Sequence, residues 1–257
     1  MKIAIIGAGA YGTALGEILS ANKYEVAYYD PFLLPDVKME DVLYEASEVL
    51  LVAPSAALPE LLPALPKNRP LIVATKGILD DKVFADFQDV AVISGPGFAD
   101  DIKAGKETFL TVTDERLMRM FGANFIKFDY TEDVRGVLMC GALKNVYAVL
   151  AGYLGLLPGG EGYEDFISEV TDEMEGMLVA NGAQAETVDL YCGVGDLRLT
   201  CDTPSRNYQY GVKLSEDALY QPEVTVEGVS VLKAIRSGVI KVPEGLVRLS
   251  QVMDIVK

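Results

Sequence analysis

The chain has 257 residues, half of them hydrophobic and about a quarter charged, which indicates a globular protein with one large domain or two modest ones. Its net charge of -16, without any run of Lys or Arg, excludes nucleic acid and acidic membranes as expected partners. The chain lacks histidine, its three cysteines have no zinc spacing, and its start lacks a leader pattern, so we expect a cytoplasmic protein without a metal site.

Short apolar runs alternate with helical segments in the first half of the chain. Strands are predicted at residues 3–6, 26–29, 49–52, 71–74 and 90–93, with a helix at 58–65. This alternation is typical of a parallel sheet with crossover helices. Residues 109–113 and 125–128 are predicted as later edge strands, and the sheet is expected to end near Asp129.

Long segments with apolar residues at helical spacing follow at 134–154, 163–180, 229–237 and 245–256. The first is long enough to span a membrane, but Lys144 and Asn145 at its centre favour a buried helix of a soluble protein. We therefore expect an α/β Rossmann-type dinucleotide-binding domain at 1–130, followed by a mostly α-helical substrate and catalytic domain at 131–257. An apolar helix face that packs within the chain or against a second copy leaves a homodimer open.

A glycine-rich turn lies between the first strand and the helical pattern that follows it. Gly7, Gly9 and Gly12 form a GxGxxG motif in the sequence KIAIIGAGAYGTALG. In a dinucleotide-binding fold, these glycines permit a tight turn, close approach of the pyrophosphate and close packing of helix on strand. A turn that serves packing alone is the alternative, but the strand and helix around the motif favour the nucleotide site.

Asp30 follows the second predicted strand, 18 residues after Gly12. An acid about 20 residues beyond the motif typically accepts hydrogen bonds from the adenosine ribose, and its charge repels a 2′-phosphate. The sequence thus favours NAD over NADP. Asp30 also precedes Pro31, and an Asp-Pro pair is often only the start of a turn.

Elimination leaves one leading candidate for a proton donor. Histidine is absent, and no tyrosine has a lysine four positions later, which excludes two common arrangements in hydride-transfer enzymes. Lys144 lies in the middle of an apolar helix, where burial should lower its pKa toward neutrality and suit it to acid/base catalysis. The alternative is a lysine whose ammonium group reaches solvent from the helix.

Further polar candidates lie at predicted turns and strand ends. Residues 192–207 combine a glycine turn with Asp196, Thr200, Arg206 and Asn207, a set able to orient a lysine and bind a phosphate. Asp196 as a helix cap and Arg206 as a surface charge are the alternatives. Lys76 and the segment 94–99 follow predicted strands at the edge where such sheets bind ligands, although Lys76 could be solvated and 94–99 a simple turn.

The chain resembles the NAD-dependent glycerol-3-phosphate dehydrogenase family in a series of motifs. In chain order they read GAGAYGTALG, ATKGI, SGPGFADDI, CGALKNV, GVGDLRLTC and SRNYQYG. VEGV at residues 226–229 and the Val-Pro pair at 242–243 extend the resemblance almost to the C-terminus. The order GALKN, GDLxxTC and SRN is specific to this family.

This resemblance implies interconversion of dihydroxyacetone phosphate and sn-glycerol 3-phosphate with NAD as cofactor. The family's acid/base lysine falls on Lys144, its partner carboxylate on Asp196 and its second lysine on Lys76. Substrate contacts are implied for Asn145, Thr200, Arg206 and Asn207. The expected cofactor site comprises Gly7, Gly9, Ala10, Tyr11, Gly12, Asp30, Pro54, Lys76, Arg206 and Glu227.

The chain departs from the family pattern at several points. It is shorter than usual, Tyr11 and Gly97 replace a tryptophan and a serine, and Asp30 replaces a basic residue. The loop after GALKN is acidic, with Glu161, Glu164 and Asp165. Two alternatives therefore stay open, a dehydrogenase of another small keto or hydroxy acid with NAD(P) and a catalytically silent NAD(H)-binding protein.

Overall fold

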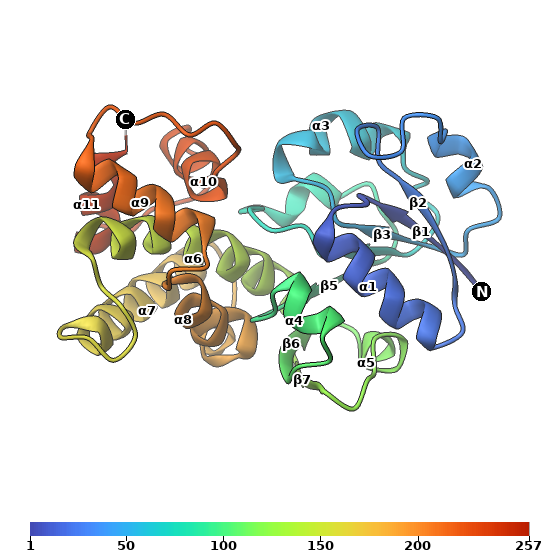
Figure 1. Ribbon diagram of the computed structural model, residues 1–257, viewed down its shortest axis with the longest axis horizontal. Coiled ribbons are helices and arrows are strands. Elements are labelled where there is room, and N and C mark those ends of the chain that lie inside the picture. Colours follow the sequence, from blue (N-terminus) through green and yellow to red (C-terminus); the bar gives the residue numbers. More distant parts are fainter. Residues whose placement is uncertain (257) are drawn as a thin grey trace. The chain divides into compact units, whose positions relative to one another are not determined.

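The computed structural model describes residues 1–256 and divides into two compact units. Unit 1 comprises Met1–Thr75 and Asp81–Val134, and unit 2 comprises Lys76–Asp80 and the chain from Arg135 onward. Figure 1 shows the sheet of unit 1 and the helices of unit 2. The sequence-based boundary between residues 130 and 131 stays a prediction.

Unit 1 is built on a seven-stranded sheet in the order β2-β1-β3-β4-β5-β6-β7. Its strands are β1 (Lys2–Ile6), β2 (Glu25–Tyr29), β3 (Glu48–Leu51), β4 (Leu71–Val73), β5 (Val90–Ser94), β6 (Thr108–Val112) and β7 (Ile126–Tyr130). The first five strands are mutually parallel, as their alternation with helical segments predicted. The Rossmann-type α/β class expected from the sequence is confirmed.

The prediction for the last two strands was partly wrong. β6 lies inside the sheet between β5 and β7 and is not an edge strand, and it pairs antiparallel with β5. β6 and β7 are parallel to one another. The pairing of β6 depends on strand neighbours that local sequence does not specify. Only β7 and β2 stand at the edges, and both are less buried than β1 and β3.

Short helices connect these strands: α1 (Ala10–Ala21), α2 (Met39–Leu43), α3 (Leu58–Leu61), α4 (Ala99–Lys103) and α5 (Glu115–Met120). The buried side chains of α1 recur at helical spacing, including Leu15, Ile18 and Leu19, and join Ile3 and Ile5 in the core of unit 1. The helix predicted at 58–65 is interrupted. The segment forms α3 over Leu58–Leu61 and then tightens into a 3₁₀ turn at Leu62–Ala64, where Pro63 cannot donate a helical hydrogen bond.

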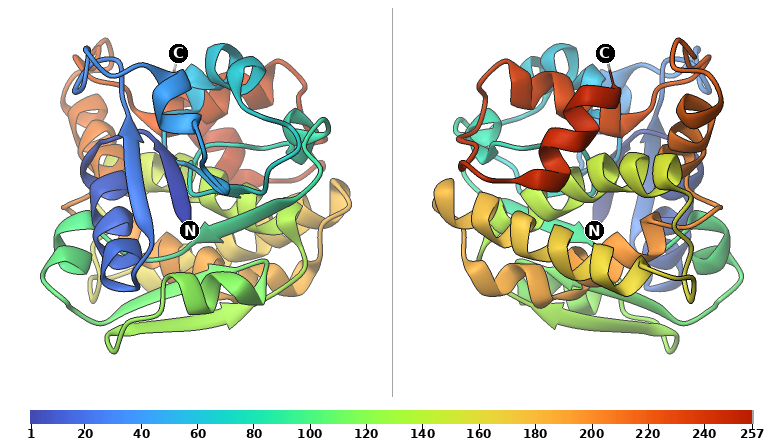
Figure 2. Two further views of the ribbon diagram at one scale, coloured as in Figure 1. Left: turned by 90° about the vertical axis from the view of Figure 1, so that its right-hand side faces the viewer. Right: turned by 90° about the vertical axis from the view of Figure 1, so that its left-hand side faces the viewer.

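Unit 2 is helical. It contains α6 (Val134–Leu154), α7 (Tyr163–Ala180), α8 (Asp196–Thr200), α9 (Arg206–Glu216), α10 (Glu227–Arg236) and α11 (Val247–Ile255), with a 3₁₀ turn at Ala185–Asp189 and a π-helical turn at Tyr191–Gly195. The predicted bounds of α6 and α7 agree with the structure, whereas α9 was not predicted. Figure 2 shows α11 lying against α7, which the contacts between these helices also indicate.

Helix α6 forms the core of unit 2. All its residues from Gly136 to Gly152 are buried, including Lys144 and Asn145. A helix that is apolar on every side must be covered by protein or lipid, and 89% of the most hydrophobic stretch of α6 is buried inside the protein. The prediction of a buried core helix is confirmed.

Two glycines allow α6 and α9 to approach closely. A Cβ atom at Gly152 would lie 2.0 Å from the carbonyl oxygen of Tyr208, and one at Gly211 would lie 2.0 Å from that of Val149. Both clashes involve backbone atoms, which cannot move without shifting a helix. Glycine is therefore needed at this helix crossing for steric reasons.

We expect Gly152→Ala to lower the free energy of unfolding by about 1–3 kcal/mol, the usual cost of overpacking. Gly176 in α7 is the matched control, because a Cβ atom there would meet no heavy atom within 4 Å. Gly176→Ala should raise the free energy of unfolding by roughly 0.5–1 kcal/mol through better helix propensity. Urea unfolding measures both, and destabilisation of similar size in both variants would contradict the packing argument.

Candidate active site

One buried carboxylate in unit 2 contacts two lysines. Asp196 is the first residue of α8, and its side chain is 1% exposed. Its Oδ1 atom lies 2.5 Å from Nζ of Lys144, and its Oδ2 atom lies 2.9 Å from Nζ of Lys76. The structure thus brings together the three residues that were predicted as catalytic. The side chain of Lys76 is 25% exposed and that of Lys144 only 3%.

Burial controls the protonation of Lys144. Desolvation is the largest effect and lowers the pKa of Lys144 to about 7, with Lys76 adding to the decrease and Asp196 opposing it. Near neutral pH the ammonium and amine forms are therefore both populated. A group with these properties can both donate and accept a proton.

Asn145, adjacent to Lys144 on α6, is linked to two other helices. The side-chain amide of Asn207 in α9 donates to Oδ1 of Asn145 at 2.8 Å, and its own Oδ1 accepts from the backbone N–H of Gly228 in α10 at 2.9 Å. Nδ2 of Asn145 donates to the carbonyl of Gly141. These bonds fix the side-chain amides of Asn145 and Asn207. Glu227, the half-buried first residue of α10, precedes Gly228 in the chain and therefore lies close to the two amides.

Thr200 and Arg206 occupy different environments. The Thr200 hydroxyl is buried and donates to the backbone carbonyl of Asp196 at 2.6 Å. Arg206 begins α9 and is exposed, and within residues 1–256 its guanidinium has no ion-pair partner. It borders a hollow of about 290 Å³ whose walls include Tyr210, Lys213 and Tyr220.

The glycine motif of unit 1 has the geometry of a phosphate-binding turn. Gly7 has φ of +115°, and a Cβ atom at Gly12 would lie 2.2 Å from the Gly7 carbonyl oxygen. A Cβ atom at Gly9 would meet no heavy atom within 4 Å, so this face of the loop is open. In the described part of the chain no side chain caps the N-terminus of α1, whose first residues are Ala10 and Tyr11.

This loop fits a dinucleotide, because the uncapped N–H groups of α1 and the helix dipole favour a pyrophosphate at the open face of Gly9. Tyr11 is half-buried and packs against the core of unit 1. Pro54 is exposed and lies three residues beyond β3. The residues predicted for cofactor binding in unit 1 thus lie at the carboxyl ends of β1, β2 and β3.

Asp30 follows β2 directly and combines the two interpretations of the sequence. Its Oδ2 accepts from the backbone N–H of Ala8 in the glycine-rich loop at 3.0 Å. Its Oδ1 accepts from the backbone N–H groups of Phe32 and Leu33 at 3.0 and 3.1 Å, which makes it the start of a turn. Desolvation acts to raise the pKa of Asp30, but these three hydrogen bonds outweigh it and leave the pKa lowered.

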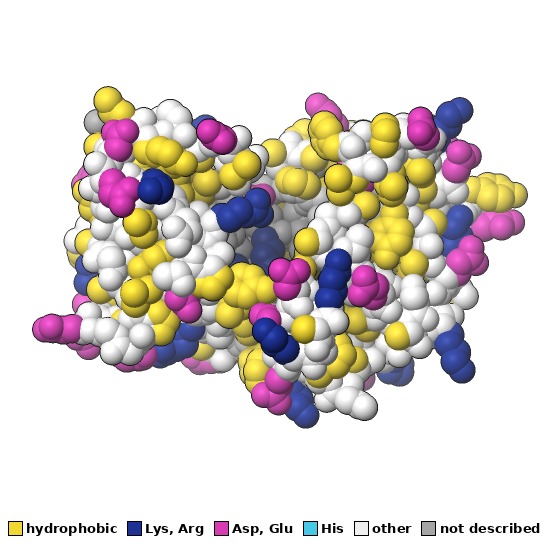
Figure 3. All heavy atoms as spheres, in the orientation of Figure 1, with side chains coloured by type: hydrophobic (Ala, Val, Ile, Leu, Met, Phe, Trp, Pro, Cys, Tyr) yellow, Lys and Arg dark blue, Asp and Glu magenta, His cyan; other side chains and the backbone are white. Residues whose placement is uncertain are grey.

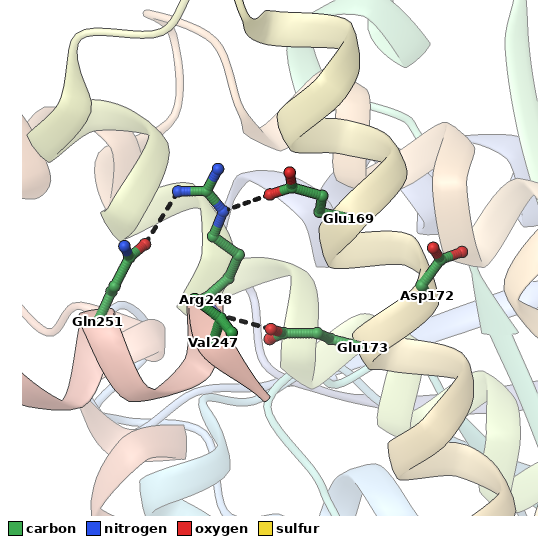
Figure 4. Close-up of a pocket in the computed structure, with 6 residues that line it drawn as sticks. All are labelled: Glu169, Asp172, Glu173, Val247, Arg248 and Gln251. Atoms are coloured by element: carbon green, nitrogen blue, oxygen red, sulfur yellow. Dashed lines mark hydrogen bonds and ion pairs between the residues drawn. The ribbon is translucent and has the colours of Figure 1, made fainter. Parts of the chain in front are cut away.

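Glu173 was not predicted from the sequence. It lies on the buried face of α7, where its carboxylate accepts from the Tyr147 hydroxyl of α6 at 3.0 Å and from the backbone N–H groups of Arg248 and Leu249. Glu173 therefore caps α11. Figure 4 shows it in a hollow of about 420 Å³ where Arg248 also contacts Glu169. A glutamate among apolar residues at helical spacing was the only signal in the sequence.

The acidic segment after α6 is partly neutralised, and its residues Glu164 and Asp165 lie in the first turn of α7 and not in the predicted loop. The guanidinium of Arg198 in α8 donates two hydrogen bonds to the carboxylate of Glu164, at 2.8 and 2.6 Å. On the face shown in Figure 3, most Lys and Arg side chains lie apart from one another, among acidic and hydrophobic ones.

The buried and exposed ion pairs of α8 should differ strongly in their effect on stability. We expect Asp196→Asn to lower the free energy of unfolding by about 3–5 kcal/mol, because two ammonium groups lose their buried counter-ion. Glu164→Gln should leave the unfolding midpoint nearly unchanged, since that pair is largely exposed. Urea unfolding of both variants at pH 6 provides the measurement, and equal effects would show that burial does not control these contributions.

Comparison with known proteins identifies the family. A family model for the C-terminus of NAD-dependent glycerol-3-phosphate dehydrogenase matches residues 133–254. A glycerol-3-phosphate dehydrogenase (NAD(P)+) from Erythrobacter litoralis is 32% identical, over 84% of this chain and 78% of that protein. One from Brucella ovis is also 32% identical, over 89% of this chain and 84% of that protein.

The fold agrees with this relationship. The crystal structure of glycerol-3-phosphate dehydrogenase from Coxiella burnetii superposes with a TM-score of 0.82 at 24% identity, covering 99% of this chain and 94% of that one. That structure supports the seven-stranded sheet followed by helices, while the relatives at 32% identity carry the evolutionary argument. The chain belongs to the NAD-dependent glycerol-3-phosphate dehydrogenase family.

Proposed function

We propose that this protein is an NAD-dependent sn-glycerol-3-phosphate dehydrogenase that reduces dihydroxyacetone phosphate and catalyses the reverse oxidation. The observation that carries this proposal is the buried Asp196 carboxylate, which contacts both Lys144 and Lys76 in a member of this family. Stability alone does not call for three ionisable groups here, because replacing a whole buried cluster of charges by apolar side chains is often neutral or stabilising. Its retention supports catalysis over a silent NAD(H)-binding role.

Each residue of the cluster has a separate role in this proposal. A bound nicotinamide cofactor would supply the hydride to the carbonyl carbon of the substrate. Lys144 donates a proton to the carbonyl oxygen and becomes a neutral amine, and in the oxidation it takes the proton back. Asp196 holds the Lys144 ammonium group in place, and Lys76 supplies a second positive charge that stabilises the negative charge developing on the oxygen.

The phosphate of the substrate requires cations and N–H donors. Arg206 supplies an exposed guanidinium without an ion-pair partner in the described chain, and Asn145 and Asn207 each have one amide hydrogen beyond the bonds given above. Thr200 is less available, because its only hydroxyl hydrogen is donated to the Asp196 carbonyl. Thr200 would need to rotate before it could donate to phosphate.

The choice of NAD rests on Asp30. Its carboxylate carries a negative charge near the end of β2, where the 2′-phosphate of NADP would be repelled. The names of the relatives specify NAD(P)+, so preference for NAD belongs to this proposal. We also propose a cytoplasmic location, consistent with three cysteines that are buried as thiols. A homodimer stays a prediction.

The test is oxidation of NADH, followed at 340 nm, with dihydroxyacetone phosphate as substrate. NADPH and unphosphorylated dihydroxyacetone run in parallel, and a panel of small keto acids tests the alternative substrate class. We expect turnover to require both NADH and the phosphate. Turnover with a keto acid and none with the phosphate ester would replace the proposed substrate, and NADH binding without any turnover would favour a silent protein.

Lys144→Met provides the matching variant, because methionine fills similar volume without a charge. We expect a loss of turnover by about two to four orders of magnitude, since the proton donor is removed. NADH affinity should stay close to that of the wild type. Near-normal turnover of this variant would remove Lys144 from the mechanism.

The pH dependence of kcat/KM should distinguish the ammonium form of Lys144 from its neutral amine form, because each direction of the reaction needs a different one. Reduction needs the ammonium form, so kcat/KM for reduction should fall as pH rises through about 7, and that for oxidation should rise over the same range. Lys76→Met removes a like charge and should move this transition to higher pH. Asp196→Asn removes the anion and should move it to lower pH. Identical pH profiles of kcat/KM in the wild type, Lys76→Met and Asp196→Asn would exclude Lys144 as the titrating group.

A further inference from the structure

The turn after β2 presents hydrophobic side chains to solvent. Phe32 is 91% exposed and Leu33 is 60% exposed, and no other large hydrophobic side chain in residues 1–256 is as exposed as Phe32. Exposed hydrophobic residues are common on protein surfaces, but these two lie next to Asp30 at the end of β2, beside a predicted ligand site. The position of Phe32 within the turn favours a ligand over a protein partner.

The turn that carries Phe32 is well defined by hydrogen bonds. Oδ1 of Asp30 accepts from the backbone N–H of Phe32 at 3.0 Å, and the backbone carbonyl of Asp30 accepts from the N–H of Leu34 at 2.9 Å. Pro31 fixes one backbone angle between them. The other carboxylate oxygen of Asp30 binds the N–H of Ala8 in the glycine-rich loop. The backbone of Phe32 is therefore held at a fixed place relative to the glycine-rich loop.

Asp30 has limited capacity left for a ribose. A carboxylate offers about four acceptor sites, and backbone N–H groups of Ala8, Phe32 and Leu33 occupy three of them. The site that remains is on Oδ2 and can accept one ribose hydroxyl. Recognition of the adenosine half of a dinucleotide by this unit therefore needs a contribution from another side chain.

We propose that Phe32 is the stacking surface for the adenine base of the cofactor, an inference that rests on the proposed function. The order along unit 1 supports it. The glycine-rich loop would hold the pyrophosphate, Asp30 lies beside this loop, and Phe32 comes two residues after Asp30 in the chain. The ligand has the same order, with the pyrophosphate first, then the ribose and then the base. An exposed aromatic ring binds any nucleobase through its face, whereas Leu33 lacks a π system.

The test uses the absence of tryptophan from the chain. Phe32→Trp introduces a single tryptophan, whose fluorescence should be quenched when adenine stacks on it. Leu33→Trp places the same reporter one residue away on the same turn and is the matched control. We expect ADP-ribose to quench Phe32→Trp strongly and Leu33→Trp weakly. Nicotinamide mononucleotide, which lacks adenine, should quench neither variant.

Calorimetry with ADP-ribose measures how much the Phe32 side chain contributes to binding. Phe32→Ala should weaken binding by roughly 5- to 150-fold, the range expected for one base stacked on an aromatic ring. Leu33→Ala should change it much less. Because both side chains are mostly exposed, the thermal unfolding midpoints should stay near that of the wild type, which confirms that the variants fold.

Different outcomes separate this proposal from the proposed function. Normal ADP-ribose affinity in Phe32→Ala, with no quenching in Phe32→Trp, would overturn the stacking role and leave the dehydrogenase proposal intact. A change in sedimentation of Phe32→Ala without a change in affinity would overturn it in favour of contact with a second copy. Failure of the wild type to bind either ADP-ribose or NADH would overturn both proposals.

Discussion

The structure of unit 2 depends on one buried ion cluster. Asp196 is almost fully buried, so its charge is tolerated only because Lys144 and Lys76 lie at its two oxygens. Three separate segments must meet to satisfy it: the core helix α6, the first turn of α8 and residues Lys76–Asp80. The burial of α6 from Gly136 to Gly152 serves this arrangement, because it excludes water from Lys144.

Much of the fold and of the candidate site could be predicted from the sequence, wherever a local pattern had a single physical explanation. The helix α6 was predicted with its true bounds because its apolar residues continue on every side, and Lys144 stood out as a charge within them. The antiparallel pairing of β6 could not be predicted, since an apolar strand carries no mark of its neighbour's direction. Glu173 was missed for a similar reason, because its partners at Tyr147, Arg248 and Leu249 are distant in sequence.

Asp30 shows why residue type and spacing can leave a role ambiguous. The sequence supported both a ribose acceptor and a turn starter, and the structure shows the backbone of the turn bonded to one carboxylate oxygen and the glycine-rich loop to the other. The two interpretations therefore compete for the same lone pairs. The number of acceptor sites left on the carboxylate decides how much of it a ligand can use, and that number depends on the folded backbone around Asp30.

Substrate attraction and proton transfer make different demands on a chain with a net charge of -16. An anionic substrate must be drawn in against this general field by local cations. Arg206 is suited to that task because a guanidinium stays charged at every physiological pH. Lys144 is suited to the other task because burial lowers its pKa to about 7, so that its charge changes during the reaction. Under the proposed function, a permanent cation binds the phosphate, while a lysine that can lose its proton acts at the carbonyl. Neither residue could replace the other.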